Sequence, residues 1–563
     1  MKRRDFLTSL GAVLGSAPFL HSARAQPGTV LKADVAIIGA GTGGFAAALA
    51  ALRNGQRVIL SEETDWIGGQ LTQQAVPPDE HPWVEQFGTT RSYRTFRDSV
   101  RSYYRSWYPL SQPAMTSIFL NPGNCSVSRI CHEPRVALAV LEQMLASYLS
   151  NGQLTLLLEH EPVQAGSMGD RLESVLLRSM AEGREVEVRA PFFVDGTETG
   201  DLLPLAGVEY VTGAEARAMT GELHAAEEAQ PQNMQAITWC FAIDYRDGED
   251  HTIPKPEEYD FWRQYTPELK PSWPGRLLDW AYSHPITLKP RILGFDPRHN
   301  ASEPGLWRYR RLADPGNFAT ADWPAVSLIN WPQNDYWLGS VIDVDQDERD
   351  RHLRRAQQLS YSLLFWMQTE APRPDGGVGW PGLRLRGDLT GTSHGLAKRP
   401  YFRESRRIRA EFTVLEQHVG KEARMKETGL SEGEVTAETF KDSVGVGSYR
   451  IDLHPSTGGN NYIDVSSLPF QIPLGALIPI RVENLIPAAK NIGTTHITNG
   501  CYRLHPVEWN IGEAAGMLIP FCRERKVLPR QVRNRDELLS DFQSYIQRQG
   551  IEIQWPDPLR RPR

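Results

Sequence analysis

A glycine-rich segment near the N-terminus has the residue types and spacing of a phosphate-binding turn. Residues 39–44 read Gly-Ala-Gly-Thr-Gly-Gly, between the β-branched run Ala33–Ile38 and the Ala- and Leu-rich run Phe45–Arg53. A second apolar run, Val58–Leu60, is followed closely by Glu62. A strand, turn, helix, strand and acidic residue in this order predict a dinucleotide site. The residues expected to form it are Gly39, Gly41, Thr42, Gly43, Gly44 and Glu62.

Each part of this motif has a physical role. Gly39 permits the tight turn, Gly41 lets the backbone approach a pyrophosphate, and Gly44 lets the helix pack closely on the strand. The N-terminus of the helix presents free N–H groups and a partial positive charge to the phosphates. Glu62 is placed to accept hydrogen bonds from the adenosine ribose hydroxyls, and its charge disfavours a 2′-phosphate.

Further motifs resemble the FAD-dependent oxidoreductases of the glutathione-reductase-like fold. Residues 68–72 form a G-G-x-x-T element shortly after the predicted ribose-binding acid. Other segments resemble one bacterial branch, the broad FAD-dependent oxidoreductase family that is distantly related to fumarate-reductase flavoproteins. These segments are VPPDEHPW (76–83), SRICHEPRV (128–136), FVDGTETGDLLPLAG (193–207), NWPQNDY (330–336), RPYFRESRRI (399–408), GSYRIDLHP (447–455) and residues 491–516. The resemblance implies that the cofactor is FAD.

The same resemblance brings three more parts of the chain to the cofactor. The two glycines of the G-G-x-x-T element run along its flavin side, and the turn after the strand at 192–194 lies near it. A C-terminal helix beginning near residue 510 points its N-terminus at the flavin, where the helix dipole stabilises negative charge. The residues so implied are Gly68, Gly69, Gln70, Asp195, Gly196, Thr197, Gly493, Asn510, Ile511 and Gly512.

A second dinucleotide site is not expected. NAD(P)H-dependent flavin reductases of this superfamily usually carry a second nucleotide domain. The other G-x-G-x-x-G in this chain, residues 377–382, contains Pro381, follows no strand and precedes no helix, so we interpret it as a loop. FAD is therefore the expected sole tightly held nucleotide, with NAD alone as the alternative.

Four side chains are candidates for the chemistry. His505 and His496 precede the predicted C-terminal helix, and a histidine can exchange a proton near neutral pH. Arg503 belongs to the same cluster. Arg403 can anchor a substrate carboxylate or sugar hydroxyls, and its spacing places Arg407 on the same helix face. The alternatives are backbone or cofactor contacts for the histidines and helix-face salt bridges for the arginines.

The cysteines and the histidine beside one of them allow two readings each. Five cysteines are present, and Cys125 and Cys131 could pair, but buried free thiols are the expectation. His132 could carry a covalently attached flavin, as in some related flavoproteins, or cap the following helix. Neither C-x-x-C nor H-E-x-x-H occurs in the sequence, so no metal site is expected.

The first 25 residues have the pattern of an export signal. Lys2, Arg3 and Arg4 precede an apolar stretch that is broken by Gly11, Gly15 and Pro18, and residues 23–25 read Ala-Arg-Ala. This pattern predicts signal-peptidase cleavage before residue 26. The Arg-Arg pair resembles a twin-arginine signal, which implies the twin-arginine translocation machinery as a partner and a periplasmic or secreted protein. A retained membrane helix is the alternative.

Length and composition predict a large α/β protein. The 563 residues exceed one ordinary core, and 40% hydrophobic with 23% charged residues is a normal globular balance. A net charge of −7 gives no support to nucleic-acid binding, and no apolar run is long enough for a stable membrane span. The expected fold is a Rossmann-like, glutathione-reductase-like FAD domain with an inserted α+β substrate domain. The expected ranges are 1–25 for the signal, 26–215 and 476–525 for the FAD domain, 216–475 for the insertion and 526–563 for a helical tail.

Together these features predict an exported FAD-dependent oxidoreductase. Its expected partners are a small polar organic substrate, in which a sugar or a carboxylate would suit the Trp- and Arg-rich segments, and an electron acceptor that the sequence does not identify. One alternative is a flavoprotein subunit that passes electrons to a membrane or periplasmic partner. Another is a non-redox binding protein or lyase that keeps FAD for structural reasons.

Overall fold

A computed structural model describes residues 28–298, 305–320 and 322–560 of the protein. The predicted export signal, residues 1–25, lies outside these ranges. None of the helices in the described ranges is both long enough and apolar enough to span a bilayer. Over the same ranges, no group of three or more His, Cys, Asp or Glu side chains is arranged to hold a metal ion.

A five-stranded parallel sheet forms the centre of the nucleotide-binding half. Its strand order is β23 (Leu485–Pro487), β8 (Phe193–Asp195), β2 (Val35–Ile38), β3 (Val58–Glu62) and β4 (Leu154–Leu158). Every neighbouring pair is parallel. The strands are buried on both faces, which explains why their sequences are continuous rather than alternating apolar runs. The predicted Rossmann-like α/β fold is confirmed.

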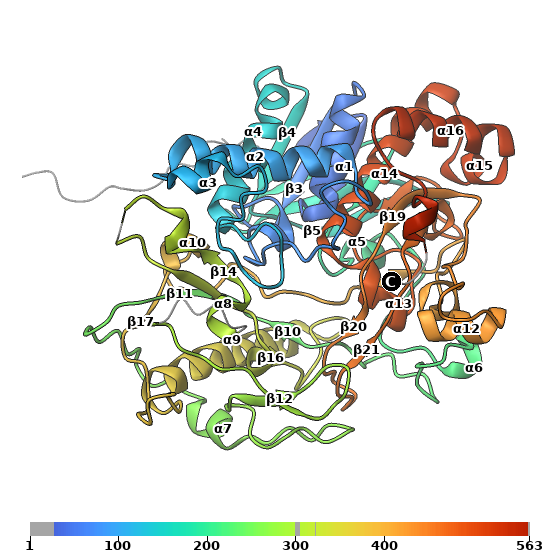
Figure 1. Cartoon of the computed structure of the whole chain (residues 1–563). Coiled ribbons are helices and arrows are strands. Elements are labelled where there is room, and N and C mark those ends of the chain that lie inside the picture. The colour runs from blue at the N-terminus through green and yellow to red at the C-terminus, as the bar shows by residue number, and fades with distance from the viewer. Residues whose placement is uncertain (1–27, 299–304, 321, 561–563) are drawn as a thin grey trace, which may run out of the picture.

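Helix α1 (Thr42–Arg53) packs against the long C-terminal helix α14 (His505–Arg525), and Figure 1 shows the two side by side. Their contact is close because it is made through glycine. A Cβ atom on Gly512 would lie 1.9 Å from the carbonyl oxygen of Gly43, and one on Gly516 would lie 2.2 Å from that of Ala47. Helix α14 thereby fixes its N-terminal turn beside the glycine-rich loop.

The predicted start of this C-terminal helix near residue 510 is wrong. Helix α14 begins at His505, with Pro506 in its first turn. Proline is well suited to that position because the first N–H groups of a helix have no intrahelical acceptor. A short helix, α13 (His496–Tyr502), precedes it. The predicted helix near the C-terminus is confirmed as α16 (Asp536–Arg548).

A second, mixed sheet and two helices complete the nucleotide-binding half. The sheet has the order β1 (Thr29–Lys32), β7 (Glu185–Arg189), β6 (Arg171–Ser179) and β5 (His160–Met168). The two helices are α4 (Pro134–Ser150) and α2 (Arg91–Trp107), which pack beside each other.

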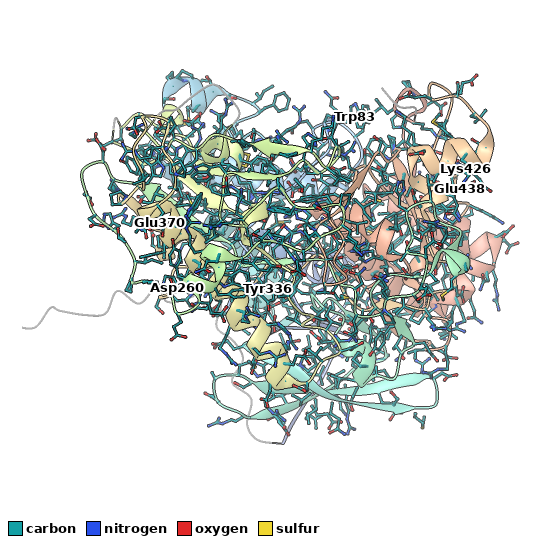
Figure 2. The ribbon with its side chains drawn as sticks, turned by 90° about the horizontal axis from the view of Figure 1, so that it is seen from below. Trp83, Asp260, Tyr336, Glu370, Lys426 and Glu438 are labelled. Atoms are coloured by element: carbon teal, nitrogen blue, oxygen red, sulfur yellow. A yellow bond between two sulfur atoms is a disulfide. The ribbon has the colours of Figure 1, made fainter. Side chains whose placement is uncertain are left out.

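The central part of the chain builds an antiparallel sheet covered by a long helix. The sheet has the order β14 (Arg311–Ala313), β15 (Val326–Ile329), β11 (Phe241–Tyr245) and β17 (Leu383–Leu385), and the helix is α9 (Gln346–Thr369). Figure 2 shows Asp260, Tyr336 and Glu370 of this part on one side of the molecule and Lys426 and Glu438 on the other. The boundaries 216 and 475 of an inserted domain stay a prediction.

The tryptophans of the central segment form an aromatic core. Trp280 lies 4.8 Å from Trp366 between ring centroids and stacks on Phe295, which also contacts Trp307 and Trp380. All five rings are buried. These buried tryptophans therefore stabilise the fold, and their number does not by itself indicate a sugar-binding face.

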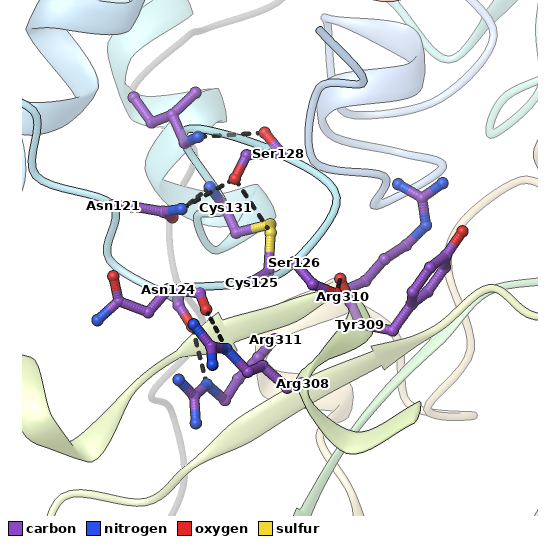
Figure 3. The surroundings of a disulfide bond; sticks show 12 residues. Asn121, Asn124, Cys125, Ser126, Ser128, Cys131, Arg308, Tyr309, Arg310 and Arg311 are labelled. Atoms are coloured by element: carbon purple, nitrogen blue, oxygen red, sulfur yellow. Dashed lines mark hydrogen bonds between the residues drawn. A yellow bond between two sulfur atoms is a disulfide. The ribbon is translucent and has the colours of Figure 1, made fainter. Parts of the chain in front are cut away.

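The expectation of free thiols at Cys125 and Cys131 is wrong, because these residues form a disulfide (Figure 3). Backbone contacts hold the closed loop: the N–H of Cys131 donates to Asn121 Oδ1, and the N–H of Gly123 donates to the carbonyl of Cys131. A Cβ atom on Gly123 would lie 1.7 Å from the carbonyl oxygen of Arg311, so the loop is packed directly on β14. Cys240, Cys501 and Cys522 are free and buried.

The disulfide predicts the thiol content of the mature protein. Of the five cysteines, two are paired, so denaturation without reductant should expose three thiols per chain. Titration with a chromogenic disulfide reagent measures this number, and prior reduction should raise it to five. Five thiols without reduction would contradict the pairing.

Candidate functional site

Three backbone turns meet at the N-terminus of α1. Gly39 has a φ of +90°, and a Cβ atom there would lie 2.5 Å from the carbonyl carbon of Gly196, in the turn after β8. A Cβ atom on Gly69, which has a φ of +54°, would lie 2.9 Å from the Cα of Gly41. Thr42 Oγ1 donates to the carbonyl of Gly68. Only glycine can occupy positions where the backbones approach this closely. The three turns form a cradle of backbone atoms at the positive end of helix α1.

Glu62 lies at the end of β3 beside this cradle. Its carboxylate accepts the N–H of Ala40 at 2.9 Å and the N–H of Thr64 at 3.1 Å. Burial, together with the like charge of Glu63, raises the pKa of Glu62 above its ordinary value. A cavity of about 390 Å³ opens next to it, a size typical of small-molecule sites. Its lining includes Gly39, Glu62, Gly196, Thr197, Glu198, Arg399 and Arg406.

The turn at Asp195 is held by its own side chain. Asp195 Oδ1 accepts the N–H of Thr197 at 3.0 Å and its hydroxyl at 2.7 Å, while Oδ2 is buried without a partner. Burial raises the pKa of Asp195 to about 7. Asn491 Nδ2 donates to the carbonyl of Asp195 and ties the segment after β23 to this turn.

A buried ionic cluster that the sequence analysis did not anticipate closes the cradle. Lys490 Nζ pairs with Glu198 and lies 3.3 Å from Glu508 Oε2. Gln70 Nε2 donates to Glu508, and the N–H of Gly43 donates to Glu508 Oε1 at 3.4 Å. Although burial opposes its charged form, the two glutamates raise the pKa of Lys490 above its ordinary value. The sequence does contain a signal for this cluster. Glu198 follows the apolar strand β8, and Lys490 follows the apolar strand β23.

The cradle fits the ADP half of FAD. A Cβ atom on Gly41 would lie 2.7 Å from Glu198 Oε1, which is buried without a hydrogen-bond partner beside the first turn of α1. An oxyanion therefore already lies against the helix end that attracts anions. The N–H groups at the start of α1 would hold the pyrophosphate, and Glu62 would hold the ribose. FAD, when bound, supplies the redox chemistry.

Four residues expected at the flavin make packing contacts within the protein. Asn510 Nδ2 donates to the carbonyl of Val444, and its Oδ1 accepts the N–H of Val446, both in β19 (Ser443–Gly447). Gly512 packs on α1, and a Cβ atom on Gly493 would lie 2.5 Å from the Cβ of Ala410. Ile511 is buried in the core. Packing within the protein accounts for all of these contacts. A role of these residues at the cofactor therefore stays a prediction.

His505, the first residue of α14, holds the loop that follows the G-G-x-x-T element. Its Nδ1 accepts the N–H of Asp79, and its Nε2 lies 3.2 Å from the carbonyl oxygen of Val76, so both ring nitrogens contact backbone. Burial lowers the pKa of His505 to about 3. The neutral ring and its two backbone partners correspond to the structural alternative and give no support to proton transfer by His505.

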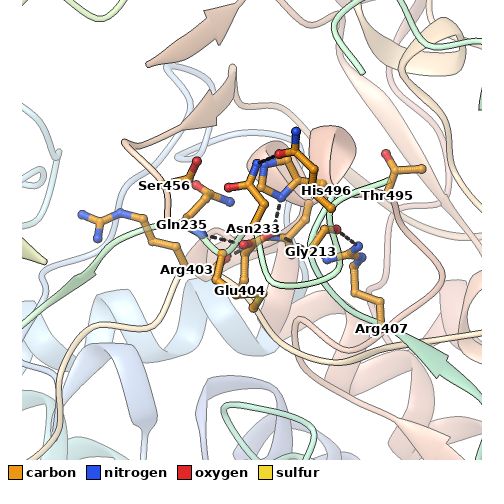
Figure 4. Close-up of polar contacts among 12 residues, drawn as sticks. Gly213, Asn233, Gln235, Arg403, Glu404, Arg407, Ser456, Thr495 and His496 are labelled. Carbon is orange, nitrogen blue, oxygen red and sulfur yellow. Dashed lines mark hydrogen bonds and ion pairs between the residues drawn. The ribbon is translucent and has the colours of Figure 1, made fainter. Parts of the chain in front are cut away.

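His496 lies on α13 in a network with Glu404 and the arginine-rich segment (Figure 4). Its Nδ1 lies 2.5 Å from Glu404 Oε1, and its backbone N–H donates to Glu215. Although burial opposes ionisation, His496 and Arg407 hold the pKa of Glu404 below its ordinary value. These contacts make His496 part of a buried ion-pair network.

The predicted helix face shared by Arg403 and Arg407 is wrong. The segment is extended, and Arg407 begins the short strand β18 (Arg407–Ile408). Arg407 pairs with Glu215 and donates to the carbonyls of Gly213 and Thr494, so it is a buried structural cation. Arg403 points elsewhere, toward Asp335 at 3.1 Å.

Arg403 and Arg503 both line a polar cavity of about 180 Å³. Arg403 donates to Thr238 Oγ1 and to the carbonyl of Ala236, and Arg503 donates to Tyr401 Oη and to the carbonyl of Asp452. The Nε atoms of both arginines are buried without a partner. Three more residues of the cavity lining carry a buried polar atom without a hydrogen-bond partner. These atoms are Arg310 Nε, Trp331 Nε1 and Tyr462 Oη.

This polar cavity adjoins the loop that starts at the cofactor cradle. Gln70 Nε2 donates to the carbonyl of Arg503. Asp79, which lines the cavity, pairs with Arg310 at 3.0 Å and donates its N–H to His505. The same loop therefore contacts the dinucleotide-binding turn at one end and the polar cavity at the other. The sequence analysis missed Arg310, whose sequence context carries no motif.

His132 does not cap the helix that follows it, because the residue at the N-cap of α4 is Glu133. The ring is buried against Phe96, and its Nδ1 lies 3.1 Å from the carbonyl oxygen of Glu133. Burial lowers the pKa of His132 to about 4. Covalent attachment of flavin at this residue stays an open alternative.

The parallel sheet, the glycine cradle, the acid at the end of β3 and the returning turn after β8 define a dinucleotide-binding oxidoreductase fold. The chain belongs to the FAD dependent oxidoreductase family, whose model matches residues 34–545. It is thus an oxidoreductase whose cofactor is FAD.

Similarity to solved structures is found only at low sequence identity and low TM-score. The L-proline dehydrogenase from P. horikoshii is 15% identical, with a TM-score of 0.18, over 36% of this chain and 30% of that one. The myxobacterial chondrochloren halogenase CndH is 16% identical, with a TM-score of 0.21, over 40% and 45%. The E. coli quinol fumarate reductase FrdA is 11% identical, with a TM-score of 0.31, over 92% and 74%.

The aligned region spans less than half the length of the first two proteins. No curated protein matches the sequence. At these TM-scores the solved structures do not indicate a substrate.

The cradle predicts that Gly41→Val abolishes stable FAD binding. The larger side chain would occupy the space beside Gly69 and Glu198 where backbone and cofactor must meet. We expect affinity for FAD to fall by at least about tenfold, which corresponds to about 1.4 kcal/mol. Flavin absorbance per chain of purified protein measures the loss. Gly433→Val is the matched control, since open space surrounds that residue, and equal flavin content in both variants would contradict the assignment.

Proposed function

We propose that this protein is an exported FAD-dependent oxidoreductase that acts on a small polar organic substrate without a dedicated NAD(P)H domain. The substrate would bind in the polar cavity. The observation that carries the proposal is that five residues of one cavity lining each carry a buried polar atom without a partner. Leaving such groups unsatisfied costs about 1–3 kcal/mol each, and a ligand that supplies oxygen atoms would recover that cost.

The size and chemistry of the cavity favour a small, oxygen-rich molecule. Its volume of about 180 Å³ is below the range of about 300–1,000 Å³ for drug-sized ligands. Most of the unsatisfied atoms are donors, which suits a carboxylate or several hydroxyl oxygens. Arg403 and Arg503 are the proposed anchors, because each presents an unsatisfied Nε.

Two observations support export. Arg3 and Arg4 precede an apolar stretch with a cleavage site, and disulfides persist mainly in oxidising compartments. The Cys125–Cys131 pair closes a short loop of the mature chain. We infer a periplasmic or secreted location, reached through the twin-arginine machinery.

The redox proposal is tested by adding substrates to the purified holoenzyme without oxygen. Glycolate, L-lactate, D-gluconate, D-galacturonate, D-galactose and ethanolamine make a suitable panel. Loss of flavin absorbance with at least one polar compound is expected. A flavin that stays oxidised with every member and is not reoxidised by their carbonyl products after chemical reduction would contradict the proposal.

Arg403→Lys predicts a specific loss of substrate affinity. Lysine keeps a positive charge near Asp335 but lacks the guanidinium Nε, so one charged hydrogen bond to the substrate is removed. Such a bond is worth about 1.5–3 kcal/mol, which corresponds to a Kd about 10–100-fold higher. Titration of the flavin spectrum with the reducing compound gives the Kd. Unchanged affinity in a correctly folded, FAD-loaded variant would remove Arg403 from the site.

The export proposal predicts the fate of an Arg3→Lys, Arg4→Lys double variant. The translocation machinery reads the paired arginines, so the lysine pair should leave full-length precursor in the cytoplasm. Cell fractionation with intact-mass measurement distinguishes precursor from a product starting at residue 26. Normal processing of the double variant, alongside normal processing of an Arg24→Lys control, would indicate the general secretory route.

A further inference from the structure

His454 lies at the end of strand β20 and lines the polar cavity. β20 (Ile451–Leu453) pairs antiparallel with β21 (Ile463–Val465). Strand alternation buries Ile451 and Leu453 on one face and turns Asp452 and His454 to the other. Asp464, opposite Asp452 in the register, also lines the cavity. The hairpin therefore presents its polar face to the proposed substrate.

A buried carboxylate orients the ring of His454. Its Nδ1 lies 2.6 Å from Asp335 Oδ2, and Asp335 is fully buried at the start of β16 (Asp335–Tyr336). Although burial opposes ionisation, Arg403 and His454 hold the pKa of Asp335 below its ordinary value. An ionised carboxylate can only accept, so Nδ1 of His454 carries a proton.

The other ring nitrogen of His454 is left for the substrate. With Nδ1 protonated, Nε2 of the neutral ring is an acceptor. Asp452 Oδ2 lies 3.6 Å from Nε2, which exceeds hydrogen-bond distance. The backbone N–H of His454 donates to Gln235, and its ring lies 5.2 Å from that of Tyr462, so its position is fixed on two sides.

The histidines first considered for proton transfer lack these properties. Both nitrogens of His505 contact backbone groups, and His496 pairs with Glu404. Neither belongs to the lining of the polar cavity, whereas His454 shares that lining with Arg403 and Arg503.

We infer that His454 is the catalytic residue that exchanges a proton with the substrate, and that Asp335 is its positioning residue. The inference rests on the proposed function. For an alcohol substrate, the O–H bond breaks and its proton passes to Nε2. The C–H bond breaks, its hydrogen and electron pair pass to FAD as oxidant, and a C=O bond forms. In the reducing direction His454 returns the proton to the oxygen.

Charged groups of both signs surround this histidine. Asp335 and Asp452 face its two nitrogens, and Arg403 and Arg503 lie behind those carboxylates. Asp464, which pairs with Arg450, lies across the hairpin, and burial raises the pKa of Asp464 to about 6. Protonation of Asp464 is thus a second source of pH dependence, which Asp464→Asn separates from that of His454.

The kinetic test compares His454→Gln with wild type as FAD-loaded enzymes. Each is mixed anaerobically with glycolate, L-lactate, D-gluconate or D-galacturonate in a stopped-flow instrument. Positioned acid–base catalysis is worth about 10²–10⁴-fold, so the limiting rate of flavin reduction should fall by that factor while the Kd changes little. The part of the decrease in rate toward low pH that persists in Asp464→Asn should also disappear. Equal limiting rates and equal pH profiles would overturn the inference.

His251→Gln is the matched control. His251 also pairs with a carboxylate, Glu249, but the pair lies on the surface away from the cavity lining. We expect it to keep the wild-type rate. If the four compounds fail to bleach wild-type flavin, that result counts against the proposed function, and the following measurement still decides the role of His454.

The tautomer of His454 is a readout that a purely structural role would not require. In ¹⁵N-histidine-labelled holoenzyme, the signal lost in His454→Gln belongs to this residue. At mildly alkaline pH it should show a protonated Nδ1 and a bare Nε2, and Asp335→Asn should change that pattern while flavin content is retained. A protonated Nε2 with a bare Nδ1 in the wild-type protein would overturn the inference.

Discussion

The close approach of three backbone turns at the N-terminus of α1 is the constraint on which the rest of the structure depends. Gly39, Gly69 and Gly196 come from three distant parts of the chain, yet side chains at these positions would overlap neighbouring atoms. The turn after β8 must therefore return to the first βαβ unit after an excursion of more than a hundred residues. Helix α14 must return from the far end of the chain, where Gly512 meets Gly43. The cradle is thus a product of the whole topology rather than of one motif.

The second organising feature is a row of side chains beside the cavity in which basic and acidic residues alternate. Arg403, Asp335, His454, Asp452 and Arg503 follow one another through contacts of 3.6 Å or less. Each of these side chains is buried or half-buried, and removal of one member would leave an uncompensated neighbour in a medium of low polarity. The Nε atoms of Arg403 and Arg503 have no partner, so the hydrogen-bonding capacity of the row exceeds what the protein itself uses.

Local patterns were enough to predict the nucleotide-binding half. A β-branched run, a glycine turn and an Ala-rich run specify β2, the cradle and α1 by short-range preferences alone. The polar cavity could not be found in this way, because its charged and titratable members include residues 79, 310, 403, 454 and 503, which meet only through tertiary packing. Where local rules were applied to such residues they failed: the i, i+4 spacing of Arg403 and Arg407 has no meaning in an extended segment. The disulfide was missed for a related reason, since spacing alone does not show that two thiols face each other.

The two histidines His505 and His454 show why position in the fold, rather than residue type, decides which group can move a proton. His505 lies in the first turn of a helix, where the dipole is positive, and Arg310 lies close to its partner Asp79. Burial there lowers its pKa to about 3, and a ring that cannot hold a proton near neutral pH cannot accept one from a substrate. His454 lies instead between two carboxylates, those of Asp335 and Asp452. A helix N-terminus that attracts the anionic groups of a cofactor is, for the same electrostatic reason, a poor place for a base. The proposed proton acceptor accordingly comes from a different element, the β20–β21 hairpin, whose polar face lines the cavity.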